Sequence, residues 1–251
     1  MLVKTEGIVI RTLNYGEGSK IITLYTRKMG KVSVLVRGAR KTKSRFHAIT
    51  QLFSYGEYIF FMGRDMGTLN QADLQFPFSD IIKDIEKTAY AAYIVELADK
   101  MTEKNEANPF LFQQLLSSLE QINSGKDPQI IANIFEMKIL QISGYKPHLK
   151  SCIICDSETN INAFSIKRGG LICSLHNEEH TIKIQTAAIK LLRLFERVDI
   201  NRLGKIDVKE ATKNQLQTTM NAFFDEYVGV HLKSKNFLSQ LKQVLNSEGD
   251  H

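Results

Sequence analysis

Three cysteines and one histidine form the pattern in this chain that is most suited to chemistry. Cys152 and Cys155 are separated by two residues, and Cys173 and His176 repeat that spacing after an interval of 17 residues. Two such pairs supply four sulfur and nitrogen donors, and their separation is typical of structural zinc sites. Four protein ligands leave no open position for water, so the spacing favours a structural Zn²⁺ over a catalytic one.

The fourth ligand and the role of the cysteines have alternatives. His180 competes with His176 for the fourth position, at a looser spacing, and Glu178 is a more remote candidate. The first two cysteines could also form a thiol pair while the third is simply buried. A redox pair of this kind usually opens a helix in a βαβ unit, and the residues around Cys152 show no such pattern, so zinc is favoured.

A run of cations is the second pattern that suggests a function. Guanidinium and ammonium groups bind phosphates, the first as bidentate forks and the second as point charges. No acidic residue lies between Glu17 and Glu57, so the run has no local partner for its charge. We expect it to contact nucleic-acid phosphates, with a solvated charged loop as the alternative. The five cations, which lie within nine residues, are Arg37, Arg40, Lys41, Lys43 and Arg45.

The net charge of the chain is concentrated at its N-terminal end. The first 80 residues hold 12 Lys and Arg against 6 Asp and Glu, a surplus of +6. The whole chain of 251 residues also carries +6, so residues 81–251 are neutral, with 21 basic and 21 acidic residues. This asymmetry indicates that one domain binds a polyanion. Among nearby aromatic residues, Phe46 is the best candidate for stacking on a base.

Hydrophobic periodicity predicts the elements that position these groups. Residues 1–76 contain five or six short strand-like runs separated by glycine turns, which predicts a small closed barrel. Among small barrels an OB-fold is favoured, and an SH3-like barrel remains the alternative. After the barrel, apolar residues recur at helical spacing. One helix is predicted to begin at Asn108-Pro109, and another to begin at Asp127-Pro128 and end at Gly144. Further helices are predicted near 186–198, 208–229 and 235–246.

The predicted fold class is α+β, with an inserted module that contains every cysteine. Between the two cysteine pairs, Gly169-Gly170 marks the turn of a hairpin that would fold the second pair onto the first. The predicted parts are an OB-fold nucleic-acid-binding barrel at 1–79, an α-helical domain at 80–146 and 184–251, and a zinc-binding module at 147–183.

Patterns typical of catalysis and of membranes are missing from the sequence. It contains no GxxxxGK[ST], GxGxxG, HExxH or GxSxG motif, so we predict a protein that is not an enzyme and has no catalytic residues. No apolar run approaches the ~20 residues of a membrane helix, and the first ten residues lack the features of a signal peptide. We therefore expect a cytoplasmic protein without a membrane partner.

The order of these features resembles the RecO family of bacterial recombination mediators. The opening stretch TEGIVIRTLNYGEGSKIITLYTRKMGKVSVLVRGARKTKSRF is similar to the family's N-terminal signature. The segments EKTAYAAYIVELADKM, NPFLFQQLLSSLEQI and IFEMKILQISGYKPHLKSCIIC resemble its helical core and the run into its cysteine cluster. The resemblance covers essentially the whole chain and is most specific in the first 45 or so residues and around the first cysteine pair.

Membership in this family would imply a nucleoid-associated DNA repair protein with an OB-fold, a helical domain and a zinc module. Such a protein binds single- and double-stranded DNA and anneals complementary strands without ATP. With RecR, it helps load RecA onto DNA coated by single-strand-binding protein (SSB). By position, the run 37–45 would be the DNA-contacting loop. This sequence departs from some members of the family in having His176 where they have a fourth cysteine, and other members lack the cluster.

Two other functions are compatible with the residues alone. Basic loops and zinc modules also serve RNA, so an RNA-binding or ribosome-associated zinc protein is the first alternative. The second is an interaction scaffold whose basic loop binds an acidic protein partner.

Overall fold

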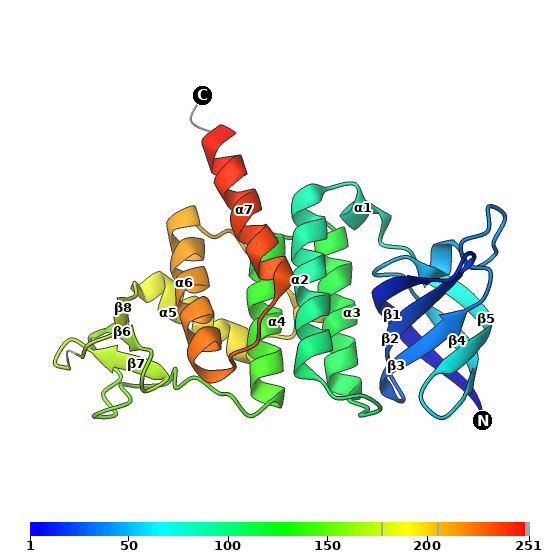
Figure 1. Cartoon of the computed structure of the whole chain (residues 1–251). Coiled ribbons are helices and arrows are strands. Elements are labelled where there is room, and N and C mark those ends of the chain that lie inside the picture. The colour runs from blue at the N-terminus through cyan, green and yellow to red at the C-terminus, as the bar shows by residue number, and fades with distance from the viewer. Residues whose placement is uncertain (177, 205, 249–251) are drawn as a thin grey trace. The chain divides into compact units, whose positions relative to one another are not determined.

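The computed structural model describes residues 1–176, 178–204 and 206–248 and has an α+β fold, which confirms the predicted class. A strand-rich N-terminal part is followed by helices, with a small sheet inserted between two of them (Figure 1). Residue packing divides the chain into two compact units, 1–128 with 232–251, and 129–231. The domain limits of 1–79, 80–146 with 184–251, and 147–183 stay a prediction. No helix in the described ranges is long and apolar enough to cross a membrane.

Five strands of the first unit form a closed barrel in the order β1-β2-β3-β5-β4. Neighbouring strands are antiparallel except β3 and β5, which pair in parallel at only two positions, Val34 with Gly67 and Leu35 with Thr68. The strands are β1 (Leu2–Tyr15), β2 (Ser19–Thr26), β3 (Gly30–Val36), β4 (Tyr55–Met62) and β5 (Gly67–Phe76), with a 3-10 turn, η1 (Ala48–Thr50), before β4.

Alternating apolar side chains fill the barrel, as the sequence predicts. In β3 every second residue, Val32, Val34 and Val36, is buried, while the residues between them are half-buried. The rings of Tyr58 and Phe60 in β4 are fully buried and supply the bulk that a small barrel needs. The other face of these strands therefore remains available for polar contacts.

Four helices complete the first unit, and α2 and α3 lie side by side (Figure 1). Asn108 accepts a hydrogen bond from the Leu111 N–H at the predicted start of α3. The Glu96 carboxylate of α2 accepts the N–H groups of Lys233 and Ser234, where α7 begins. The helices are α1 (Ser79–Ile82), α2 (Ile85–Met101), α3 (Pro109–Asn123) and α7 (Lys233–Glu248).

The barrel packs closely on the segment between α2 and α3, and Gly30 makes this possible. Its φ of +63° lies in the left-handed region, and a Cβ added there would lie 1.9 Å from the Glu106 carbonyl oxygen. The next residue, Lys31, donates to the carbonyl oxygens of Asp99 and Thr102 at the end of α2. These contacts satisfy carbonyl groups that have no partner within the helix.

The second unit combines helices with a three-stranded sheet of order β7-β6-β8. Gly144 follows its first helix with a φ of +82°, as expected for a glycine that ends a helix. The helices predicted near 186–198 and 208–229 are present. The elements are α4 (Pro128–Ile142), β6 (Ile161–Ser165), β7 (Gly170–Cys173), β8 (Thr181–Lys183), α5 (Thr186–Arg197), a 3-10 turn η2 (Ile200–Arg202) and α6 (Glu210–Tyr227).

Candidate metal centre and nucleic-acid interface

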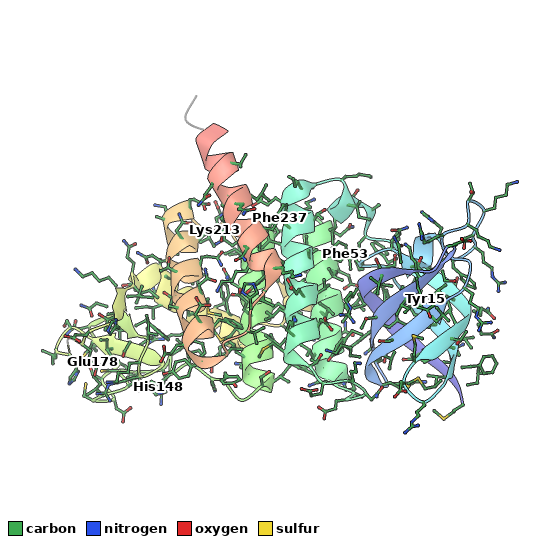
Figure 2. All side chains as sticks on the ribbon, in the orientation of Figure 1. Tyr15, Phe53, His148, Glu178, Lys213 and Phe237 are labelled. Carbon is green, nitrogen blue, oxygen red and sulfur yellow. The ribbon has the colours of Figure 1, made fainter. Side chains whose placement is uncertain are left out.

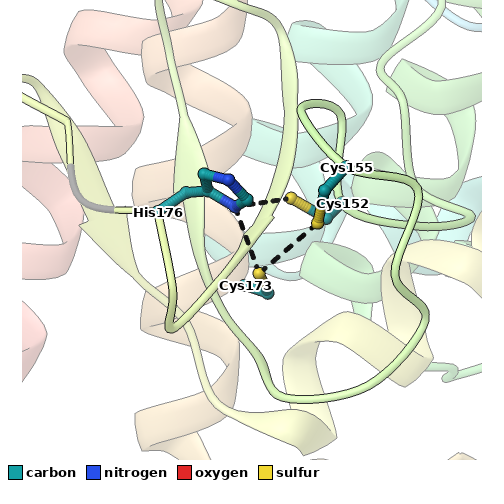
Figure 3. A group of neighbouring side chains, drawn as sticks. All are labelled: Cys152, Cys155, Cys173 and His176. Carbon is teal, nitrogen blue, oxygen red and sulfur yellow. Dashed lines mark hydrogen bonds between the residues drawn. The ribbon is translucent and has the colours of Figure 1, made fainter.

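The four predicted donors converge in the second unit, as Figure 3 shows. The ligand atoms of Cys152, Cys155, Cys173 and His176 all lie within 4.8 Å of one another. The His176 Nδ1 lies 3.3 Å from the Cys173 Sγ and 3.6 Å from the Cys152 Sγ. The Cys155 and Cys173 sulfurs are 3.9 Å apart, and neither forms a disulfide.

These separations fit four ligands around one tetrahedral metal ion. Bonds of about 2.3 Å to sulfur and 2.0–2.1 Å to nitrogen place tetrahedral donors roughly 3.5–3.8 Å apart. Three soft thiols and one imidazole are the donor set that zinc prefers. The four side chains therefore form a group that could hold one metal ion.

Each donor pair is shaped by a tight turn. The Cys152 carbonyl accepts the Asp156 N–H at 2.8 Å, and Asp156 itself has a φ of +59°. The Cys173 carbonyl accepts the His176 N–H at 3.0 Å. Antiparallel β6 and β7 form the predicted hairpin, with Gly169 at a φ of +68° before β7. This hairpin brings the second pair back to the first.

Two helices of the same unit anchor the donor pairs. The Tyr227 hydroxyl in α6 donates to the Ile166 and Lys167 carbonyl oxygens at the hairpin turn, at 3.0 and 2.9 Å. The Arg193 guanidinium in α5 donates to the Leu149 and Lys150 carbonyl oxygens, at 2.7 and 2.9 Å, just before the first pair. The cluster is thus placed by backbone contacts rather than by a large apolar core.

The electrostatic environment favours ionisation of one thiol. Burial opposes it, but the backbone N–H groups of Ile154, Cys155 and Cys173 donate to the Cys152 sulfur, and its pKa is lowered to about 6. The Ser157 N–H lowers the pKa of the exposed Cys155 thiol, but desolvation and the sulfurs of Cys152 and Cys173 together outweigh it, so the net pKa is raised. Because the thiolate is the form that binds metal, Cys152 is prepared for coordination at neutral pH.

The competing candidates for the fourth position lie elsewhere. Glu178 accepts hydrogen bonds from the Arg168 guanidinium and from the Ser165 hydroxyl, so its oxygens are engaged away from the cysteines. His180 is exposed and belongs to no metal-ligand group in the described part of the chain. The structure therefore brings His176 to the three cysteines.

The predicted basic run forms most of the segment between β3 and η1, and all five of its cationic residues are exposed. None of them forms an ion pair with a carboxylate of the described residues. The backbone of this basic loop (residues 37–45) folds through successive turns, in which Lys41 N–H bonds to the Gly38 oxygen and Ser44 N–H to the Lys41 oxygen. Arg40 fixes the loop to the β1–β2 turn through the oxygens of Gly16 and Gly18.

Two other cations of the barrel behave differently. Arg27 pairs with Glu6 and also donates to Gln113 of α3. Lys31 lies 3.1 Å from an Asp99 carboxylate oxygen, and both side chains are largely buried. These charges stabilise the packing of the barrel on the helices, whereas the charges of the basic loop pair with no carboxylate in the part of the chain that the structure describes.

Lys20 is a further cation of the same surface that was not singled out from the sequence. It lies in β2 opposite Val36, the residue that precedes the basic loop. Burial and the nearby charge of Arg40 lower the pKa of the Lys20 ammonium. The register of the β2–β3 hairpin is the signal from which the position of Lys20 beside the basic loop could have been predicted.

The barrel aromatics divide into core and surface residues. Tyr25, Tyr58 and Phe60 are buried, while Tyr15, labelled in Figure 2, is 54% exposed and Phe61 is 53% exposed. Phe46, the predicted stacking candidate, is half-buried beside the basic loop. Tyr15 and Phe61 therefore offer natural controls for any role of Phe46.

Comparison with known proteins gives one consistent result. The family model described as "Recombination protein O N terminal" matches residues 1–78, and "Recombination protein O C terminal" matches residues 82–236. A "DNA repair protein RecO" of Bacillus mycoides (strain KBAB4) is 45% identical over 243 residues, which cover 96% of this chain and 98% of that protein. A protein of the same name from Bacillus cereus (strain AH187) is 44% identical over the same coverage.

The two family models follow one another along nearly the entire sequence, and the relatives match it almost from end to end. A role in DNA repair and recombination is consistent with a cationic barrel, and the lack of a catalytic motif in the sequence agrees with it. The chain belongs to the RecO family, whose members are recombination mediators rather than enzymes.

Proposed function

We propose that this protein binds single- and double-stranded DNA through its barrel, anneals complementary strands, and helps RecR load RecA onto DNA coated by SSB. Membership in the RecO family supports the proposal of these partners. We also propose that the protein acts in the cytoplasm, in association with the nucleoid.

We also propose that the barrel is an OB-fold. Five strands, a closed order of β1-β2-β3-β5-β4 and a short parallel contact between β3 and β5 support this interpretation. A fold of this kind presents a curved outer face and its loops to nucleic acid. The basic loop and Lys20 lie together on such a surface.

The observation that carries the proposal is the exposure of five cations that pair with no carboxylate of the described residues, whereas Arg27 and Lys31 are both paired. Burying or pairing a charge within the protein removes it from contact with a ligand. The basic loop instead holds its charges apart and in solvent, an arrangement that a polyphosphate backbone can neutralise. Such contacts bind DNA with little dependence on its sequence.

Annealing needs no active-site chemistry in this account. Two single strands repel each other through their phosphates, and the repulsion acts over a Debye length of about 8 Å at physiological salt. A cationic loop that neutralises phosphates lowers this repulsion while the bases remain free to pair. The protein would thereby accelerate an encounter that base pairing then makes permanent.

We further propose that Cys152, Cys155, Cys173 and His176 bind a structural zinc ion. The complete set of four donors, the donor spacing and the lowered Cys152 pKa support this assignment. The ion would hold together a module whose buried apolar cluster is formed by Ala163, Ile172 and two of the cysteines themselves. It would supply folding energy and no catalytic step.

Strand annealing tests the DNA-binding proposal. A variant with alanine at the five loop cations should anneal complementary oligonucleotides at least tenfold more slowly than the unaltered protein, with or without SSB. A matched control removes an equal charge from exposed residues outside the barrel: Lys100, Lys150, Lys183, Lys190 and Arg197. It should retain most of the activity.

Equal annealing by the five-alanine variant and the unaltered protein would refute the role of the loop. Equal losses in the variant and the control would show that only net charge matters. A parallel titration with RNA of the same sequence tests the alternative function, because a marked preference for RNA would favour an RNA-binding protein.

A further inference from the structure

A polar hollow of about 510 Å³ lies beside the basic loop, on the surface of the barrel. Its volume falls within the range of small-ligand sites. No carboxylate is among the described residues that line it, so an anionic strand can approach it without repulsion from those residues. The lining residues are Arg45, Phe46, Asn70, Gln71 and Ala72.

Arg45 is held in a defined orientation at this hollow. Its guanidinium carbon lies 4.7 Å from the centre of the Phe46 ring, a cation–π contact. Its Nη2 donates to the Asn70 carbonyl oxygen at 3.4 Å. The flat group is thus supported on one side by an aromatic ring and tied at its edge to β5, whereas an exposed arginine is ordinarily free to rotate.

The Asn70 carbonyl oxygen is accessible because the ladder between β4 and β5 is irregular. Ile59 pairs with Gln71 and Phe60 pairs with Leu69, so Asn70 is the extra residue of a β-bulge. On the other edge of β5, pairing with β3 is confined to Gly67 and Thr68 among the described residues. The bulge therefore makes the Asn70 backbone oxygen available to the Arg45 guanidinium, and Asn70 is among the residues that line the hollow.

The backbone of Phe46 is likewise fixed, by hydrogen bonds at its N–H and at its carbonyl oxygen. Its N–H bonds to the Ser44 hydroxyl at 3.2 Å, and its carbonyl oxygen accepts the Thr50 hydroxyl at 2.8 Å. The ring packs against the barrel core. Phe46 is accordingly a rigid support for the Arg45 guanidinium, so little conformational entropy is lost when a ligand stacks on that group.

We propose that this hollow binds one unpaired nucleobase of a single strand whose phosphates contact the rest of the basic loop. The base stacks on the outer face of the Arg45 guanidinium, and the amides of Asn70 and Gln71 bond to its edge. This inference rests on the proposed function, and it separates Arg45, which contacts a base, from Arg37, Arg40, Lys41 and Lys43, which contact phosphates.

The chemistry of the lining favours a base over a phosphate or an acidic peptide. A guanidinium plane stacks on the flat face of any base. Asn and Gln amides each carry donors and an acceptor, so they can pair with the mixed edge of a base. An anion would use only the donors. Since bases in a duplex are stacked on each other, the hollow is accessible only to a single strand.

Binding to a thymidine oligonucleotide and to an abasic oligonucleotide of equal length and charge tests the inference. The unaltered protein should bind the base-bearing strand about tenfold more tightly. Arg45→Lys keeps the charge and removes the plane, and it should reduce this preference to within about twofold. Phe46→Leu should act similarly by loosening Arg45. Phe61→Leu, at an exposed aromatic residue of the same barrel, should leave the preference unchanged.

The outcomes separate this inference from the proposed function. Equal affinity of the unaltered protein for the two strands would overturn the base site, as would a preference that survives in Arg45→Lys. In either case the loop would still bind phosphates if affinity falls steeply with salt. Binding that is weak and insensitive to salt would instead refute the proposed function. Arg45 is exposed, so its variant gives an answer even if Phe46→Leu impairs folding.

Discussion

The basic loop and the cysteine cluster arrange their polar groups in opposite ways. In the cluster, donors from two distant turns converge, with all four ligand atoms within 4.8 Å of one another. In the loop, five cations extend from nine consecutive residues into solvent, and none pairs with a described carboxylate. The first arrangement encloses a small ligand, and the second needs a large one.

This difference indicates what each ligand does for the protein. A metal at the cluster would link segments that share only a small apolar core, so its main effect is on stability. DNA at the loop would replace solvent around charges that are already placed by backbone turns, so its main effect is binding. Removing one ligand should therefore alter folding, and removing the other should not.

The largest expected effect is the loss of the metal. Cys155→Ser removes a ligand at an exposed position, where the change leaves no cavity. If the module binds the proposed zinc ion, we expect the variant to lose it and to be destabilised by several kcal/mol, because binding of a structural metal is coupled to folding. Thermal unfolding together with elemental analysis measures this effect, and a chelator should reproduce it in the unaltered protein.

Ser174→Ala is the matched control, since this exposed residue lies between two donors without being one. It should keep the metal and the stability of the unaltered protein. DNA affinity should survive in Cys155→Ser, because the basic loop belongs to the other unit. Unchanged unfolding after chelation, in protein shown to be metal-free, would contradict a structural role for the ion.

A smaller effect distinguishes internal from external cations. Lys31→Ala breaks an ion pair whose side chains are 13% and 17% exposed, and it also removes the ammonium that donates to the Asp99 and Thr102 carbonyl oxygens at the end of α2. We expect a loss of about 2 kcal/mol in the free energy of unfolding, somewhat less than for a fully buried pair. Denaturant unfolding measures this loss, and the DNA affinity of the folded protein should stay within about twofold of normal.

Lys41→Ala provides the reverse case. This exposed cation should contribute nothing measurable to stability, while its loss weakens single-strand binding severalfold. If Lys31→Ala weakened DNA binding as much as Lys41→Ala and left unfolding unchanged, the division between internal and external charges would be wrong.

The smallest expected effect concerns Lys20. Alanine at this position should lower the affinity for single strands roughly three- to fivefold, the contribution of one phosphate contact. Its pKa is lowered by burial and by Arg40, so Lys20 loses its proton before ordinary lysines as pH rises toward about 10.4. Phosphate binds the protonated form of Lys20. The affinity for single strands should therefore begin to fall at pH values below about 10.4, before ordinary lysines lose their protons.

Lys20→Arg keeps the charge at all of these pH values. It should bind as tightly as the unaltered protein at neutral pH and should lose the early decline. A decline of the same size in both proteins would assign the pH dependence to another group. Fluorescence anisotropy of a labelled oligonucleotide at several pH values makes the measurement.

Local sequence patterns predicted much of the fold. Alternation in β3 and the Asn108 cap of α3 depend on neighbouring residues, and the structure confirms them. The spacing of the cysteines and His176 predicted a cluster because two tight turns and one hairpin suffice to assemble it. The family resemblance, drawn from the opening stretch and the run into the first cysteine pair, is confirmed by the comparisons.

Contacts between residues distant in sequence could not be predicted in this way. The Lys31–Asp99 pair joins a strand to a helix 68 residues later, and nothing in either segment specifies the other. The bulge at Asn70 depends on the register of β4 against β5, which a sequence alone leaves undetermined. The hollow beside Arg45 follows from that register, so it was found only from the structure.

The salt dependence of single-strand binding tests the central claim most directly. If the loop makes about five phosphate contacts, the logarithm of the binding constant should fall against the logarithm of salt concentration with a slope near −3.5. Alanine at Arg37, Arg40, Lys41, Lys43 and Arg45 should flatten this slope and weaken binding to all sequences alike. A slope that remains unchanged in that variant would contradict the account.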